Sequence, residues 1–386
     1  MKKLSLLAIL TLSVSVILCG CGKKKEDPAI EEVTLETQEY TPVKEAPQTE
    51  PTEESVLDDV PPEEGMVRSR LTNEWVSADV GALRPLAVMI PNDKSALPQY
   101  NISNADIVYE CLVEGEITRL MAIYGDWTNL ERVGNIRSCR DYFVYWAFEW
   151  DAIYIHYGGP FYIDDLIARE DTQNINCIDY ANATFRDTAK NSTDNAFTSA
   201  ERIKEAADYY GYPTEYREGY SDDNHFQFAT NSEPNTLEQY SDAIDAKKID
   251  MSPAYPVTNC YFVYNEETGL YERFQHLSGD SDGPHVDLAT NEQLAFKNVL
   301  VQNTYFEVRD QKGYLAFQCH DTTRDGWFFT NGKGIHVTWE KTADYSATRY
   351  YDDDGNEIKL NTGKTMICIL EDGDSFNVDD KVIEAD

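Results

Sequence analysis

Residues 22–66 contain almost no large apolar side chains, and this segment limits where the chain can build a core. It carries fourteen acidic residues, four lysines and many Pro and Thr. A segment of this composition cannot bury enough apolar surface to offset the conformational entropy lost on ordering. We therefore predict a flexible acidic stalk over residues 21–66, which puts any folded part after it.

The chain begins with a short basic and apolar leader. Lys2 and Lys3 precede an apolar run from Leu4 to Leu18, which is short for a membrane span but suits a signal-peptide core. The run ends in Leu18-Cys19-Gly20-Cys21, which resembles the lipobox of bacterial lipoproteins. The resemblance implies that residues 1–20 are a lipoprotein signal peptide and that the Cys21 thiol is acylated, palmitate being one such chain. It places the protein at the extracytoplasmic face of the cell membrane. The alternatives are an ordinary secretory signal or a short buried helix.

The bulk charge bears on the kind of partner. The chain has 33 basic and 69 acidic residues, a formal net charge of −36. Such a surface repels nucleic acid and anionic headgroups, so we expect no nucleic-acid partner. The sequence has no Walker loop, no Gly-x-Ser-x-Gly elbow and no His-Glu-x-x-His pair, and we predict no cofactor.

Six cysteines lie beyond the leader, and none of them forms a Cys-x-x-Cys pair: Cys111, Cys139, Cys177, Cys260, Cys319 and Cys368. This spacing disfavours zinc and thioredoxin-like sites, and we predict no metal. Most of the six sit in apolar, strand-like runs. Buried thiols and disulfides explain that placement equally well.

The first folded segment predicts a mixed α/β domain over residues 67–235. Residues 85–90, 105–113, 117–124, 132–137 and 151–156 read as strands. Ser138 is a plausible cap for a helix whose apolar face includes Trp146 and Trp150. Thr198-Ser199-Ala200-Glu201 reads as a capping box that opens a second helix, which ends at Gly211.

A polar stretch around residues 235–255, punctuated by prolines, marks a boundary. Beyond it nearly everything reads as short strands separated by turns such as Asn331-Gly332-Lys333-Gly334, and only residues 288–296 look helical. We predict a mostly antiparallel β domain over residues 255–386, a sandwich or an open barrel. The fold class predicted for the whole chain is α+β.

The densest polar constellation lies in the first domain, near strand ends and strand-to-helix turns, where α/β sheets collect functional groups. We call Arg119, Arg137 and Arg140 the arginine crest. The other members of the polar constellation are Glu110, Glu114 and His156, with Arg186 as a further candidate. Arginines beside a helix start can hold a phosphate or a carboxylate. The alternative is that Asp141, Glu110 or Glu114 neutralises them internally.

One further run draws attention in the second domain. Asp282, His285 and Asp287 could contact a metal ion, but their spacing matches no familiar metal loop. A solvated turn is the favoured interpretation.

Several motifs resemble the YerB-like family of bacterial lipoproteins, in order along residues 84–370. They are Arg84-Pro85-Leu86-Ala87-Val88-Met89-Ile90, Ala105-Asp106-Ile107-Val108-Tyr109-Glu110, Glu114-Gly115-Glu116-Ile117-Thr118-Arg119, Arg137-Ser138-Cys139-Arg140, His156-Tyr157-Gly158-Gly159 and Thr338-Trp339-Glu340-Lys341. The resemblance implies a lipoprotein with an N-terminal and a C-terminal domain, both of unknown function.

Two hypotheses about function follow. The first is a membrane-anchored binding protein for an envelope glycan, another wall-associated ligand or a protein partner. The second is an envelope enzyme acting on a phosphate-bearing glycan or lipid-linked intermediate. In the second, the arginine crest holds the anion, His156 is the acid/base, and Glu110 or Glu114 orients it.

Overall fold

The computed structural model describes residues 59–190, 193–222, 224–277 and 281–384. The predicted signal peptide, Cys21 and most of the predicted stalk lie outside these ranges. The stalk was predicted to reach residue 66, but the Asp59 carboxylate accepts hydrogen bonds from the Asn231 and Ser232 amides. The folded part therefore begins earlier than expected. Within the described ranges, no helix combines the length and the apolar character that a membrane crossing requires.

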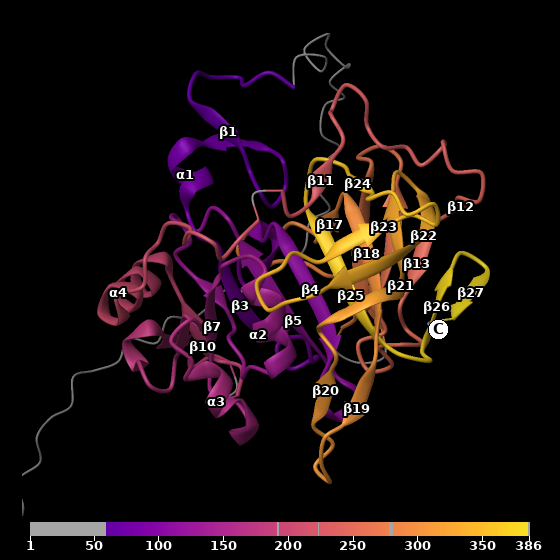
Figure 1. Ribbon diagram of the computed structural model, residues 1–386. Coiled ribbons are helices and arrows are strands. Elements are labelled where there is room, and N and C mark those ends of the chain that lie inside the picture. The colour runs from indigo at the N-terminus through magenta and orange to yellow at the C-terminus, as the bar shows by residue number, and fades with distance from the viewer. Residues whose placement is uncertain (1–58, 191–192, 223, 278–280, 385–386) are drawn as a thin grey trace, which may run out of the picture. The chain divides into compact units, whose positions relative to one another are not determined.

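One mixed sheet runs through both predicted domains (Figure 1). Its strand order is β12-β22-β21-β18-β25-β4-β5-β3-β7-β8, with β23 beside β22. The strands in that order are β12 (Ile244–Asp245), β22 (Lys333–Lys341), β21 (Asp321–Thr330), β18 (Asn298–Thr304), β25 (Thr365–Glu371), β4 (Ile107–Leu112), β5 (Thr118–Tyr124), β3 (Leu86–Pro91), β7 (Ile153–His156), β8 (Asn174–Asn176) and β23 (Arg349–Tyr351). The two segments expected to be separate domains thus share one sheet, and their predicted limits stay a prediction.

The junction between the segments is parallel pairing at the centre of this sheet. β25 pairs with β18 on one side and with β4 on the other, and both pairings are parallel. Figure 1 shows the yellow β25 beside the purple β4. Every residue of β4 and β18 is buried, as expected for strands covered on both faces.

A second, antiparallel sheet comes mainly from the C-terminal segment, in the order β16-β15-β14-β13-β26-β27 with β17 beside β15. Its strands are β16 (Asp282–Pro284), β15 (Leu270–His276), β14 (Tyr261–Asn265), β13 (Lys248–Asp250), β26 (Ser375–Val378), β27 (Lys381–Glu384) and β17 (Ala295–Phe296). The α+β class, mixed in its first part and mostly antiparallel in its second, is confirmed. The C-terminal strands, however, divide between the two sheets.

Short pairings complete the strands. They are β1 (Met66–Arg68) with β2 (Trp75–Ser77), β10 (Ala196–Thr198) with β6 (Val133–Gly134) and β9 (Phe185–Arg186), β11 (Gln227–Phe228) with β24 (Lys359–Leu360), and β19 (Phe306–Val308) with β20 (Leu315–Phe317). The strand predicted over residues 132–137 is therefore reduced to two residues.

The helices are short. They are α1 (Ala78–Ala82), α2 (Asp141–Phe148), α3 (Asp164–Ile167) and α4 (Ala200–Tyr210), with 3-10 turns at Ile102–Asn104, Glu114–Glu116, Phe161–Ile163 and Ala181–Ala183. In α4, Ser199 rather than Thr198 is the cap, since its side chain accepts from the Arg202 amide. Gly211 ends the helix at φ 72°, a conformation that glycine adopts without strain.

Two local predictions were wrong. Residues 288–296 form no helix, because Asn291 has φ +58° and β17 pairs with β15 instead. Ser138 does not cap α2, whose N-cap is Arg140. The segment before α2 stays extended because the Arg137 amide donates to the Met89 carbonyl and the Cys139 amide to the Gly158 carbonyl.

Neighbouring residues of β4 point to opposite faces of the main sheet. Tyr109 faces α2 and donates to the carboxylate of Glu149 at 2.5 Å. Glu110 faces the second sheet and accepts from Arg273 of β15 at 2.8 Å. The core is continuous across the two segments, and a buried polar network lies on each face of β4.

Candidate functional site

The structure brings Arg119 beside the segment that carries Arg137 and Arg140. Arg119 Nη1 donates to the Ser138 oxygen at 2.6 Å, and the positive charges of Arg140 and Arg137 act on its guanidinium. Arg140 makes a bidentate contact with Glu114, through Nε at 2.7 Å and through Nη2. Burial opposes the charge of Arg140, but the contact with Glu114 raises its pKa above the usual value. Arg137 lies at the rim, with Nε 4.0 Å from Asp194.

His156 is not presented to a cleft. Its side chain is buried, Nδ1 lies 2.9 Å from the Gly158 carbonyl, and Nε2 lies 3.0 Å from Asn174 Oδ1. Burial lowers the pKa of His156 despite these contacts. Both ring nitrogens are therefore engaged inside the protein.

Glu110 is likewise engaged inside the protein. Its Oε1 accepts from Asn92 at 2.9 Å and from Thr118 at 2.7 Å, and its Oε2 accepts from Arg273. Neither Glu110 nor Arg273 has any exposed side-chain surface. Glu110 therefore does not join the arginine crest, because it lies on the face of β4 toward the second sheet.

Arg186 lies on β9. Its Nη1 donates to Asn195 Oδ1 and its Nη2 to the Tyr157 hydroxyl, each at 2.5 Å. Tyr157 is a partner that the sequence did not suggest.

The run 282–287 is not the solvated turn that was favoured, because two of its three candidate ligands are buried. Asp287 accepts from the Asn101 and Ser103 amides. His285 lies between Arg273 and Gln99, while Asp282 faces His276. Across the part of the chain that the structure describes, no group of three ligating side chains is arranged to hold a metal ion.

The described surface has an open groove of about 930 Å³ to which both segments contribute. We call it the tyrosine–arginine groove, after Arg70, Tyr216, Arg217, Tyr345, Arg349 and Tyr351, which line it. Three acidic side chains also line it: Glu218, Asp222 and Glu340. In a chain with a net charge of −36, this groove is balanced between cations and carboxylates.

Each groove arginine is held by contacts that orient it. Arg217 donates from Nε to Asp151 Oδ1 at 2.7 Å and lies 3.9 Å over the ring of Tyr220. Arg70 lies 4.1 Å over the ring of Tyr216. Cation–π contacts of this kind keep planar guanidinium groups beside planar rings. The groove therefore presents pre-positioned donors next to aromatic faces.

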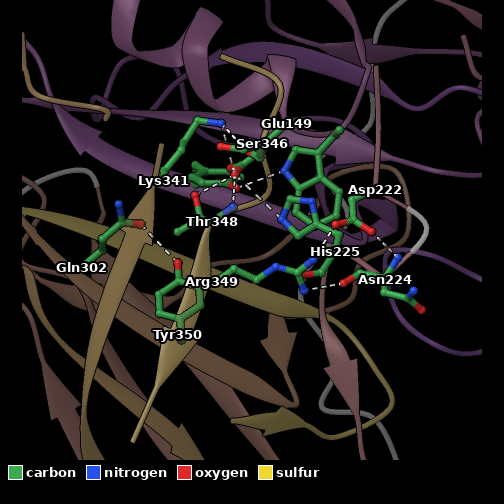
Figure 2. A network of polar contacts seen from close by, with 12 residues as sticks. Glu149, Asp222, Asn224, His225, Gln302, Lys341, Ser346, Thr348, Arg349 and Tyr350 are labelled. Atoms are coloured by element: carbon green, nitrogen blue, oxygen red, sulfur yellow. Dashed lines mark hydrogen bonds and ion pairs between the residues drawn. The ribbon is translucent and has the colours of Figure 1, made fainter. Parts of the chain in front are cut away.

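Arg349 forms the part of the wall that joins the two segments. It pairs with Asp222 and with Glu357, the latter at 2.8 Å, and its Nη1 also donates to the Asn224 carbonyl (Figure 2). On the same strand, β23, Tyr351 donates to Glu340 of β22 at 2.9 Å. Burial raises the pKa of Tyr351 to about 12, together with the contact with Glu340.

Behind this wall lies the buried network of Figure 2, centred on Glu149. The Glu149 Oε2 atom accepts from the Thr348 amide at 2.8 Å and from its hydroxyl at 2.6 Å. Lys341 Nζ lies 3.8 Å from the same oxygen, and burial lowers the pKa of Lys341. Because Thr348 precedes Arg349, this network fixes the backbone that carries the groove arginine.

His225 also lies beside Glu149 in this network. Its ring stacks on Trp150 at a centroid distance of 3.5 Å, and Nε2 lies 3.8 Å from Glu149. Burial, with Lys341 and Arg349 nearby, lowers the pKa of His225 far below its usual value. The imidazole is therefore neutral, and Glu149 faces Lys341 as its cation.

The sequence reasoning missed the groove. Its side chains come from strands and loops that are distant in the chain, and only two local signals exist. Tyr216-Arg217-Glu218-Gly219-Tyr220 and Arg349-Tyr350-Tyr351 each place arginine beside tyrosine in a polar context. Neither segment was singled out, because neither matches a catalytic motif.

The described cysteines are six buried free thiols, so the structure favours that alternative over disulfides. Burial raises the pKa of the Cys139 thiol to about 12. Thiols of this kind are poor nucleophiles at neutral pH.

Residues 71–213 match the domain described as "Protein of unknown function (DUF3048) N-terminal domain", and residues 250–367 match the corresponding C-terminal domain. The chain is 28% identical over 324 residues to the "Putative lipoprotein YerB" of Bacillus subtilis (strain 168), covering 83% of this chain and 91% of that protein.

A solved structure has the same fold. The crystal structure of the YerB protein from Bacillus subtilis is similar with a TM-score of 0.66 and 24% identity. The similarity covers 79% of this chain and 96% of that one. The fold that the two segments build together is therefore shared with that protein.

Proposed function

Because the chain belongs to the DUF3048 family of YerB-like proteins, whose two domains are both described as being of unknown function, we propose its function from its own groove. The proposal is an extracytoplasmic, lipid-anchored protein that binds a glycan of the cell envelope in the tyrosine–arginine groove. The observation that carries it is the combination of oriented arginines, carboxylates and tyrosine rings in one open groove of about 930 Å³.

This combination of groups suits a glycan. A sugar ring has an apolar face that packs on an aromatic ring, and an edge of hydroxyls that both donate and accept hydrogen bonds. Arg70 and Arg217 supply donors, Glu340 and Asp222 supply acceptors, and Tyr216 is a ring of the wall. The balance of charge favours a neutral segment of a polymer over a strongly charged one.

The location rests on the leader and on the relative. The curated relative is named a putative lipoprotein, and this chain has its own Cys21 at the end of a lipobox-like run. Acylation of Cys21 would tether the protein by residues 22–58, so that the groove could reach the envelope polymer beyond the membrane surface.

A binding role has more support than catalysis by the arginine crest. The acid/base candidate His156 has both ring nitrogens in internal contacts, and Glu110 is paired with Arg273. A general base has to reach the proton of a bound substrate, which these contacts do not favour.

The test is calorimetric titration of the purified chain with N-acetylated chitooligosaccharides and with soluble fragments of the cell wall. Tyr351→Ala and Arg70→Ala should each raise the Kd at least about tenfold, which corresponds to roughly 1.4 kcal/mol. Tyr209→Ala is the matched control, because Tyr209 is 70% exposed on α4 and does not line the groove. Equal affinities for the groove variants and the control, or no binding by any oligosaccharide, would reject the proposal.

A further inference from the structure

Arg119 is a recessed cation without a carboxylate partner among the described residues. Only 6% of the residue is exposed, and its hydrogen bond from Nη1 goes to a carbonyl, that of Ser138. Its Nε and Nη2 atoms donate to no described residue, yet they are not among the polar atoms that are sealed from solvent. Two donors of a recessed guanidinium thus remain open toward solvent.

The other recessed arginines of the fold have a different environment. Arg273 pairs with Glu110 at 2.8 Å, and Arg84 lies 3.3 Å from Asp151. Arg140, next to Arg119, has Glu114. Buried charges are costly unless they are paired, so an arginine left without a carboxylate in the same fold indicates a missing anion.

The neighbours of Arg119 increase that cost. Burial, together with the positive charges of Arg140 and Arg137, lowers the pKa of Arg119 to about 10. Glu114 is already committed to Arg140 by its bidentate contact, and Arg137 is only 4.0 Å from Asp194. The three guanidinium groups therefore exceed the carboxylates that directly contact them.

We propose that Arg119, together with Arg137 at the rim, binds a phosphate group. Arg119 contacts the carbonyl of Ser138, the residue that follows Arg137 in the chain. Two neighbouring guanidinium groups suit a tetrahedral anion whose oxygens point in several directions. A planar carboxylate is satisfied by one bidentate arginine, as Glu114 is by Arg140. This site is separate from the tyrosine–arginine groove, which none of the three crest arginines lines.

The experiment titrates the full-length chain in detergent with inorganic phosphate at constant ionic strength, followed by ³¹P NMR line width. Binding should be saturable for the native chain and at least about tenfold weaker for Arg119→Gln and for Arg137→Gln. Arg202→Gln is the matched control, because Arg202 of α4 also donates to backbone carbonyls, those of Asn182 and Thr184. It should bind phosphate like the native chain.

Parallel titrations identify the source of the phosphate and its chemistry. Binding of a glycerol phosphodiester as tightly as inorganic phosphate assigns the site to an envelope polymer, and binding of inorganic phosphate alone assigns it to the free anion. Acetate that binds as tightly as phosphate would overturn the assignment to a tetrahedral anion.

Two outcomes would overturn the site itself. The first is an absence of saturable binding by the native chain, and the second is binding by Arg119→Gln and Arg137→Gln that is as tight as that of the native chain. If Arg119→Gln does not fold, Arg137→Gln decides alone, because Arg137 is 30% exposed and tolerates change. Tyr351→Ala should bind phosphate normally, so that failure of this site and failure of the groove are distinguishable.

Discussion

Glu110 and Arg273 form an ion pair of 2.8 Å in which neither side chain is exposed, and each belongs to a different family domain. Their contact crosses from the main sheet to the second sheet. The Cys260 thiol and the hydroxyl of Thr118 contact the same carboxylate. The pair is therefore part of what holds the two family domains together.

Glu110→Gln should destabilise the protein by about 3–5 kcal/mol, because it leaves the Arg273 charge buried without its counter-ion. Urea denaturation followed by circular dichroism measures the change. Adding Arg273→Met should recover part of the loss. Glu266→Gln is the control, since it breaks an exposed pair with Lys247 that solvent screens, and it should leave stability nearly unchanged. A loss below about 1 kcal/mol for Glu110→Gln would contradict the account.

The stability of the chain should fall as the pH rises through the titration of Glu371. Burial, with Asp374 and Glu116 nearby, raises the pKa of Glu371 from 4.5 to about 7. A raised carboxyl pKa means that the folded state favours the protonated form. Its contribution to stability is then full below pH 4.5 and is lost as the pH rises through about 7.

Glu371→Gln removes this dependence, since glutamine mimics the protonated acid. The variant should gain Tm relative to the native chain above neutral pH, and the gain should disappear in acid. Thermal scans at a series of pH values measure it. Glu205→Gln, on the exposed side of α4, should show no such trend. A gain that is the same at every pH would show that titration is not its cause.

The six thiols beyond the leader should be unreactive in the native state. All are buried and free, and burial raises the pKa of Cys177 to about 12. A thiol reagent added at neutral pH should label none of them until a denaturant is present, and should then label all six without prior reduction. Labelling that requires a reductant would indicate disulfides.

Cys21→Ala should abolish membrane attachment if the leader is a lipoprotein signal. Labelled palmitate should appear in the native chain and not in the variant, and fractionation should move the folded part out of the membrane fraction. Cys19→Ala is the matched control two residues earlier. Retention of Cys21→Ala in the membrane would point to a different anchor.

Local patterns in the sequence predicted local structure well. The apolar runs around residues 86–90, 107–112 and 365–370 are strands of the main sheet, and the capped segment before Gly211 is a helix. The period of apolar residues carries this information, because a strand or helix has to bury one face or both.

The errors arose where distant groups decide the local structure. The segment around Ser138 has a helix-capping sequence, but its backbone bonds to Met89 and Gly158 keep it extended. Residues 288–296 have a helical period, yet pairing of Phe296 with Tyr271 of β15 competes successfully. In both cases tertiary contacts override a weak local preference.

The sequence indicated one candidate site and missed the other, for the same reason. The arginine crest was visible because its members are clustered in the sequence, and the structure brings Arg119 beside Ser138. The partner of Glu110 was not visible, because Arg273 is 163 positions away and arginine is common on surfaces. The groove was missed for the same reason, since Arg70, Arg217 and Arg349 meet only after folding.

The central place of β25 has a consequence for biosynthesis. A ribosome delivers β4 and β5 early and β25 almost last, yet β25 lies between β4 and β18. Until it arrives, β4 presents an open edge of backbone donors and acceptors that invites pairing with other chains. A nascent chain of this topology therefore has to be kept from premature association until its final strands emerge. A chain that lost only the segment from β25 onward would leave the main sheet open between β4 and β18.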